Sequence, residues 1–251
     1  MEHKPFLCRV LKRGSRIHLP QIALSVEQCH NNDKLIFWHK LYAKRTLPAN
    51  IPRKIQEMVE LHPLKPYLPP NPRLLMLGSF PPPRTRWSMD FFYPNFINDM
   101  WRILGLVFKG EKLAFIDTPH KKFKLEAIKE LLNQKGIALY DTATEVNRLN
   151  NNASDKFLEI ITPTDIASLL KQIPLCSAVC ATGGKAAEEL SRQLNAEVLK
   201  TGESTAFTAN GQNMKFYRMP SSSRAYPMSV ERKAEFYRRM FIETGILPNQ
   251  S

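Results

Sequence analysis

Cysteine is scarce in this chain, with four residues among 251. The number is small for a disulfide scaffold of this length, and no Cys-x-x-Cys pair is present to suggest a zinc or iron–sulfur centre. Cys176 and Cys180 lie in the apolar run LCSAVCATG, at a spacing that places both on one side of a strand. We therefore expect buried structural thiols and no metal site.

Long apolar runs are also missing. No segment reaches the length needed to span a membrane, and none has the form of a secretory signal. There is no internal repeat and no low-complexity tract. We therefore expect a cytoplasmic protein that has no membrane partner.

Two common catalytic signatures are absent. The sequence has no Gly-x-Ser-x-Gly, and five of its six histidines precede the first expected strand, which gives little support to Ser-His-Asp hydrolysis. In GGKAAEE (183–189), Val179 and Ala186 occupy the positions where a phosphate-binding P-loop needs Gly and Ser or Thr. A strand-to-helix turn that requires small residues is the favoured interpretation, although the helix N-terminus there can still face a phosphate.

The net charge of +13 is unevenly distributed. Residues 1–55 hold 11 Lys/Arg and 3 Asp/Glu, whereas residues 56–251 hold 25 and 20. The first range predicts a basic N-terminal extension, either poorly ordered, which its composition favours, or an arm that grips phosphates. The second range is mildly basic, which permits nucleic-acid binding without requiring it.

The range 56–251 alternates apolar strand patterns with helical patterns and predicts an α/β domain. Four buried parallel strands with helices on both faces would form a three-layer α/β/α sandwich. Helix N-caps are expected at Asn98, Thr164 and Ser229, and a helix end at Gly136. The expected strands are 73–79, 137–143, 176–183 and 216–221, and the expected helices are 98–108, 121–136, 162–173, 184–194 and 229–245.

Two segments far apart in the chain, Leu75–Gly105 and Phe216–Ser229, resemble halves of one site. Each begins as a short strand and continues into a loop rich in Pro, Ser and Arg. In a parallel sheet such loops emerge at the carboxyl ends of the strands, where ligands bind. Arg, Ser and aromatic residues on these loops suit a partner with phosphates and flat rings.

The first of these segments carries a cluster of aromatic residues. Core packing is the favoured interpretation for Trp87 and Trp101. Tyr93 lies close to Asn95 in a Pro-interrupted stretch, and this combination can sandwich a flat heterocycle and hydrogen-bond its edge, as an extruded nucleobase is held. The full cluster comprises Trp87, Phe91, Phe92, Tyr93, Phe96 and Trp101.

These motifs resemble the uracil-DNA glycosylase superfamily over roughly residues 60–245, and most of all its hypoxanthine-DNA glycosylase and mismatch-specific branches. GSFPPP (78–83) is similar to the first motif of the superfamily, a Gly-x-x-Pro loop that follows the first strand. FFYPNFINDMWR (91–102) is similar to the aromatic and Asn segment of those branches, and MPSSSRA (219–225) stands where the second motif stands. The resemblance implies a uracil-DNA glycosylase-like fold with a central four-stranded parallel sheet.

The resemblance also implies an activity, namely hydrolysis of the N-glycosidic bond of a deaminated base, hypoxanthine or uracil, flipped out of DNA in base excision repair. The protein would be a monofunctional, monomeric enzyme acting on damaged or mismatched DNA, single- or double-stranded, and would need no cofactor. Asn95 is the expected catalytic amide. Base contacts are assigned to Gly78, Ser79, Phe80, Tyr93 and Met219, and DNA contacts to Pro81, Pro220, Ser221, Ser222, Ser223 and Arg224.

Two positions depart from the family pattern. Phe80 stands where many members carry the Asp or Asn that handles water, and Met219 stands where members active on uracil often carry His or Asn. These departures leave open a binding module of the same fold without catalysis. An unrelated α/β hydrolase acting on a nucleotide or small ester is a further alternative.

Overall fold

The computed structural model describes residues 59–149 and 155–249. The expectations for the basic extension 1–55 lie outside these ranges. In the described residues, no helix is long and apolar enough to cross a membrane.

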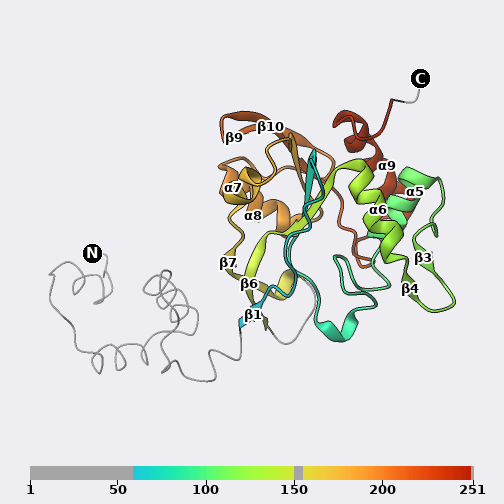
Figure 1. Cartoon of the computed structure of the whole chain (residues 1–251). Coiled ribbons are helices and arrows are strands. Elements are labelled where there is room, and N and C mark those ends of the chain that lie inside the picture. The colour runs from blue at the N-terminus through green and yellow to red at the C-terminus, as the bar shows by residue number, and fades with distance from the viewer. Residues whose placement is uncertain (1–58, 150–154, 250–251) are drawn as a thin grey trace, which may run out of the picture. The chain divides into compact units, whose positions relative to one another are not determined.

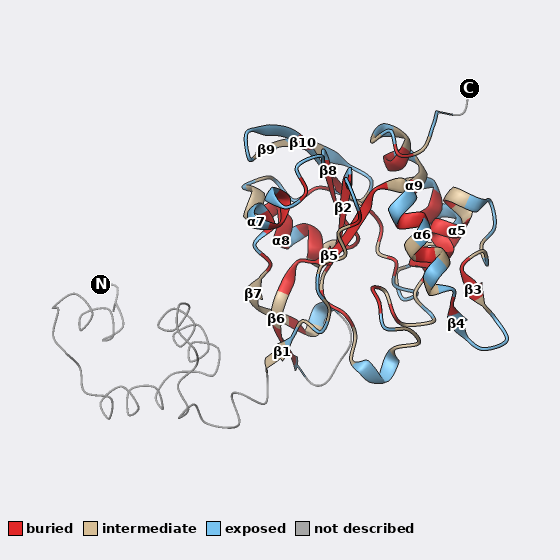
Figure 2. Cartoon of the chain, viewed as in Figure 1, coloured by how far each residue is buried: buried red, intermediate tan, exposed pale blue. Residues whose placement is uncertain are grey.

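The central sheet contains five strands in the order β5-β2-β8-β10-β9. Four of them are the expected ones, and each neighbouring pair among them is parallel. Figure 2 shows that β2, β5 and β8 are buried. Their bounds are β2 Leu74–Gly78, β5 Ile137–Asp141, β8 Ala178–Ala181 and β10 Gln212–Arg218.

The prediction of a purely parallel, four-stranded sheet was wrong, because β9 (Ser204–Ala209) pairs antiparallel with β10 at the edge. A turn at Asn210 and Gly211 joins the two strands, and both residues have positive φ. Asn-Gly is a favoured pair for such hairpin turns. Strand β9 alternates exposed and half-buried residues, so it lacks the continuous apolar run that β2, β5 and β8 have.

Helices cover both sides of this sheet (Figure 1). α7 (Ile166–Lys171) and α8 (Gly184–Leu194) lie on one side, and α5 (Met100–Lys109), α6 (Leu125–Lys135) and α9 (Val230–Glu243) lie on the other. The ends of α6 and α9 agree with the sequence: Gly136 ends α6 with a left-handed φ of 62°, and the Ser229 side chain accepts from the Arg232 N–H.

The N-caps of α5 and α7 lie one residue later than expected, at Asp99 and Asp165. The Asp165 side chain accepts from the Ser168 N–H, as an N-cap does. The Thr164 hydroxyl instead donates to the Asp141 carbonyl.

A second, antiparallel sheet was not anticipated from the sequence. It consists of β1 (Val59–Leu61), β6 (Ala143–Arg148) and β7 (Leu158–Pro163), in the order β1-β6-β7. Strand β6 follows β5 after a single residue, so this sheet extends from the carboxyl edge of the central one. Short elements complete the described fold: β3 (Ile116–Asp117), β4 (Lys122–Phe123) and the 3₁₀ turns η2 (Arg84–Arg86) and η4 (Asp155–Phe157).

Candidate active-site cleft

A cleft of about 630 Å³ opens at the carboxyl ends of the central strands. Residues of both loops that the sequence singled out line it, so the two segments do meet in one place. Further lining residues come from the ends of β5 and β8 and from η4. The lining comprises Gly78–Pro82, Arg86, Tyr93–Asn95, Ile97, Asn98, Asp141, Asp155, Thr182, Gly184, Lys185 and Ser221–Pro227.

The loop after β2 forms one wall of the cleft. The Ser79 hydroxyl donates to the Asp155 carboxylate at 2.7 Å. The Phe80 ring lines the cleft but is only 9% exposed, because it packs in a small apolar cluster with residues of β6 and β7. Phe80 thus brings an apolar edge to the position where the family resemblance leads one to expect a polar group.

Tyr93 reaches the cleft from a strained backbone, with a φ of 49°. Its hydroxyl shares a hydrogen bond of 3.0 Å with the Thr182 hydroxyl, and its ring meets Trp101 edge-on with 5.9 Å between the centroids. Burial raises the pKa of Tyr93 well above its usual value, and the nearby Asp141 carboxylate adds to this. The residue therefore presents a neutral, fixed aromatic ring.

Asn95 lies two residues further along the same wall. Its side-chain oxygen accepts from the Ile97 N–H at 3.2 Å, which orients the amide. The amide nitrogen donates to no other side chain or carbonyl within residues 59–149 and 155–249. Asn95 can therefore offer two N–H donors to a ligand in the cleft.

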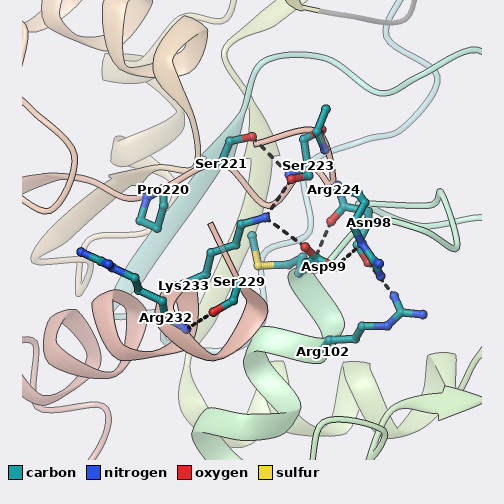
Figure 3. Close-up of polar contacts among 12 residues, drawn as sticks. Asn98, Asp99, Arg102, Pro220, Ser221, Ser223, Arg224, Ser229, Arg232 and Lys233 are labelled. Carbon is teal, nitrogen blue, oxygen red and sulfur yellow. Dashed lines mark hydrogen bonds and ion pairs between the residues drawn. The ribbon is translucent and has the colours of Figure 1, made fainter. Parts of the chain in front are cut away.

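A second wall is the serine loop, residues 221–224, which a buried ion pair holds in place (Figure 3). The Lys233 ammonium donates to the Asp99 carboxylate at 2.9 Å and to the Ser223 carbonyl at 2.8 Å. Arg224 reaches the other Asp99 oxygen at 3.2 Å, and the Asp99 N–H donates to the Ser222 carbonyl. One carboxylate at the start of α5 thus connects both predicted segments to α9.

The charge around the cleft is mixed. Arg86 and Arg224 are exposed and Lys185 is half-buried, so these cations are accessible to a polyanion. Asp141 and Asp155 contribute negative charge to the same lining. Among the described residues, no group of three or more His, Cys, Asp or Glu is arranged to hold a metal ion.

Two of the predicted site residues do not reach the cleft. Met219 is 2% exposed and belongs to the main hydrophobic core, and it is absent from the lining. Pro220 is also buried and absent from the lining, and its carbonyl accepts from the Tyr237 hydroxyl. We therefore leave Met219 out of the proposed base contacts and Pro220 out of the proposed DNA contacts.

The sequence analysis also missed a buried pair at the cleft. The His62 Nε2 atom lies 2.9 Å from Asp141 Oδ2, and the two side chains are 2% and 8% exposed. His62 precedes the first expected strand, and Asp141 falls within the expected strand 137–143. The signal that was available is an ionisable residue at the carboxyl end of a buried strand, the place where α/β proteins carry their ligands.

Comparison with known proteins gives little further information. No family model matches the chain, and no curated protein matches it. Among solved structures, the chain is similar to the solution NMR structure of a Methanosarcina acetivorans protein provisionally described as a uracil DNA glycosylase. The identity is 22%, the TM-score is 0.49, and the match covers 75% of this chain and 99% of the other. At this level the similarity supports no argument about activity or substrate.

Proposed function

We propose that this protein is a DNA glycosylase that hydrolyses the N-glycosidic bond of a deaminated base flipped out of DNA. The observation that carries the proposal is the cleft itself, whose lining combines the fixed Tyr93 ring and the Asn95 amide with the serine loop and Arg224. The first wall suits a nucleobase and the second suits a phosphate backbone. The family resemblance of the three motifs supports the same reading.

Tyr93 and Asn95 would recognise the base. An extruded base is typically held by stacking on an aromatic ring and by hydrogen bonds to its edge. Hypoxanthine and uracil both present a carbonyl oxygen that can accept from the Asn95 amide. Extrusion costs a few kcal/mol and is easiest at damaged or mispaired bases, which contributes to selectivity.

Asn95 would also act in the chemical step. As the bond breaks, the departing base gains negative charge, which a preorganised donor stabilises. One such donor commonly contributes about 2.7–4 kcal/mol. This chemistry needs no metal or organic cofactor. The proposed enzyme is monomeric and monofunctional, and it would act in base excision repair.

The serine loop and the exposed cations would hold the DNA. The Ser221 and Ser223 hydroxyls accept from the Ser223 and Ala225 N–H groups, so each still has its O–H to donate to a phosphate oxygen. Pro81, a proposed DNA contact, belongs to the same lining. Arg224 and Arg86 would contact phosphates as well. Substitution of Arg224 by Ala should weaken binding to all DNA sequences alike and reduce the salt slope by about one.

A direct assay uses the full chain and end-labelled oligonucleotides that contain uracil, hypoxanthine, xanthine or a G·T mismatch, in single and double strands. Abasic products are then cleaved with alkali. Strand scission with at least one of these substrates is expected, and no scission with any of them at stoichiometric protein would overturn the enzyme proposal. Asn95→Ala should lower the rate about 10²–10³-fold with DNA binding retained. The matched control is Asn213→Ala, at an exposed position of β10 away from the cleft.

A binding module without catalysis is the second candidate, and the position of Phe80 favours it. Its ring occupies the part of the cleft wall where the family resemblance leads one to expect a water-handling group. Such a module would retain tight binding to lesion-containing DNA but release no base. The same scission assay, run beside a binding measurement, separates the two candidates.

A further inference from the structure

The cleft contains a carboxylate whose two oxygens have different surroundings. Asp141 Oδ2 is paired with the His62 ring at 2.9 Å. Oδ1 has no hydrogen-bond partner within the parts of the chain that the structure describes, and Asp141 is part of the cleft lining. The side chain is 8% exposed, so the carboxylate is held among protein atoms with one oxygen available to a small molecule.

His62 fixes this arrangement from the other side. Its Nδ1 lies 3.1 Å from the Leu64 nitrogen and 2.8 Å from the Leu64 carbonyl oxygen. In the neutral tautomer that accepts from the Leu64 N–H, the Nε2–H donates to Asp141 Oδ2. This arrangement uses Oδ2 and leaves Oδ1 as an acceptor. The ring is also packed against Phe80 and Tyr140, with centroid distances of 5.2 and 4.7 Å.

Gly78 shows that the structure makes room for this carboxylate. A Cβ atom at Gly78 would lie 2.2 Å from Asp141 Oδ1, a distance that no real contact allows. Gly78 and Asp141 are direct neighbours in the β2–β5 register. The glycine of the first motif is therefore required here because the carboxylate of the next strand occupies the space of its side chain.

We propose that Asp141 is a catalytic residue that orients and deprotonates the attacking water, and that His62 is its positioning residue. The inference rests on the glycosylase function proposed above. It also accounts for Phe80, because the water-handling group would have moved from the loop after β2 to the end of the neighbouring strand β5. Asp155 is the other acidic lining residue, but it is exposed and its Oδ1 already accepts from Ser79.

The step balances without a cofactor. A water oxygen bonds to C1′ of the sugar while the bond from C1′ to the base nitrogen breaks, and the electron pair of that bond leaves with the base. One water proton passes to Asp141 Oδ1 and then to solvent, and the departing base takes up a proton from solvent. The products are a free base and an abasic site.

The test begins with Asp141→Asn, which keeps the size of the side chain and an oxygen that can accept from His62. Single-turnover excision should fall about 10²–10⁴-fold, the usual contribution of a general base, while binding to lesion-containing DNA is unchanged. The matched control is Asp117→Asn, which removes the carboxylate of an exposed His–Asp pair (Asp117 and His120, 2.9 Å) away from the cleft. The control should excise at the rate of the unmodified protein.

Two further readouts separate catalysis from a structural effect. In Asp141→Ala, added formate should restore part of the excision rate in proportion to its concentration, because a small carboxylate can occupy the vacated space. A merely structural role would not respond to formate. For His62, the Gln variant retains an N–H donor and should keep more of the rate than the Leu variant.

The outcomes also distinguish this inference from the proposed function. Excision by the unmodified protein with an unchanged rate in Asp141→Asn overturns the inference and leaves the glycosylase function standing. A reduced rate in Asp141→Asn without rescue of Asp141→Ala by formate overturns the role in deprotonation. Absence of excision by the unmodified protein overturns both proposals.

Discussion

Replacing Lys233 by Met tests the buried ion pair that joins the two walls of the cleft. Lys233 is 0% exposed, and its ammonium donates to the Asp99 carboxylate at 2.9 Å and to the Ser223 carbonyl at 2.8 Å. Met is of similar length and apolar, so the variant removes the charge and both hydrogen bonds while it fills most of the space. The Asp99 carboxylate, 2% exposed, is then left without its buried partner.

The expected cost follows from what remains around Asp99. Removal of one partner from a buried pair destabilises by about 3–5 kcal/mol, because an uncompensated charge stays buried. Here Arg224 still reaches Asp99 at 3.2 Å, but its side chain is 58% exposed and so compensates in part. We therefore expect the lower end of that range, about 3 kcal/mol. The Ser223 carbonyl also loses its donor, so DNA binding should weaken in the same variant.

Urea denaturation with linear extrapolation measures the change in the free energy of unfolding. The matched control is Lys112→Met, which removes an exposed pair with Glu231, where side chains are 43% and 58% exposed. That control should cost less than about 1 kcal/mol. The double variant Lys233→Met/Asp99→Asn should recover part of the loss, because the buried charge is gone. A loss for Lys233→Met no larger than that of the control would refute the reasoning.

Three further outcomes are expected. Gly78→Ala should displace Asp141 and lower excision at least as much as Asp141→Asn, and a wild-type rate would contradict the steric argument. Ser229→Ala should cost about 1 kcal/mol of stability in the same denaturation assay, because α9 loses its side-chain cap. Burial raises the pKa of Cys176 from 9.0 to about 11, and that of Cys180 further. As pH rises, the thiols of the unfolded chain therefore lose their protons before those of the folded protein. The free energy of unfolding should fall between about pH 9 and pH 11, and the fall should be less steep in the double variant Cys176→Ala/Cys180→Ala.

The central elements were predictable because their signals are local. Strands β2, β5 and β8 are short apolar runs, and each of the five main helices repeats apolar residues at helical spacing. Ser229 and Gly136 marked helix ends by side-chain or backbone properties that act within a few residues. Thr164 and Asp165 are adjacent candidates for the N-cap of α7, and Asp165 takes the role. The Thr164 hydroxyl donates to the carbonyl of Asp141, a residue distant in sequence, so no local pattern contains this contact.

The second sheet and the edge strand had weaker signals. β9 is half-exposed along its length, and β6 and β7 carry charged and polar residues on their accessible faces. Such strands lack the continuous apolar run of a buried parallel strand. The Asn210–Gly211 pair is a local hairpin signal, but it does not by itself identify the half-exposed strand before it.

The sequence by itself determined that two loops, after β2 and after β10, emerge at one edge of a parallel sheet and line one cleft. Only the tertiary structure decided which side chains face that cleft. Met219 lies two residues before the serine loop and yet packs into the core, whereas Asp141 and His62, 79 residues apart, meet beside Gly78. The physical reason is that loop position follows from local strand patterns, but side-chain contacts depend on strand order and register, which pairing between distant segments sets.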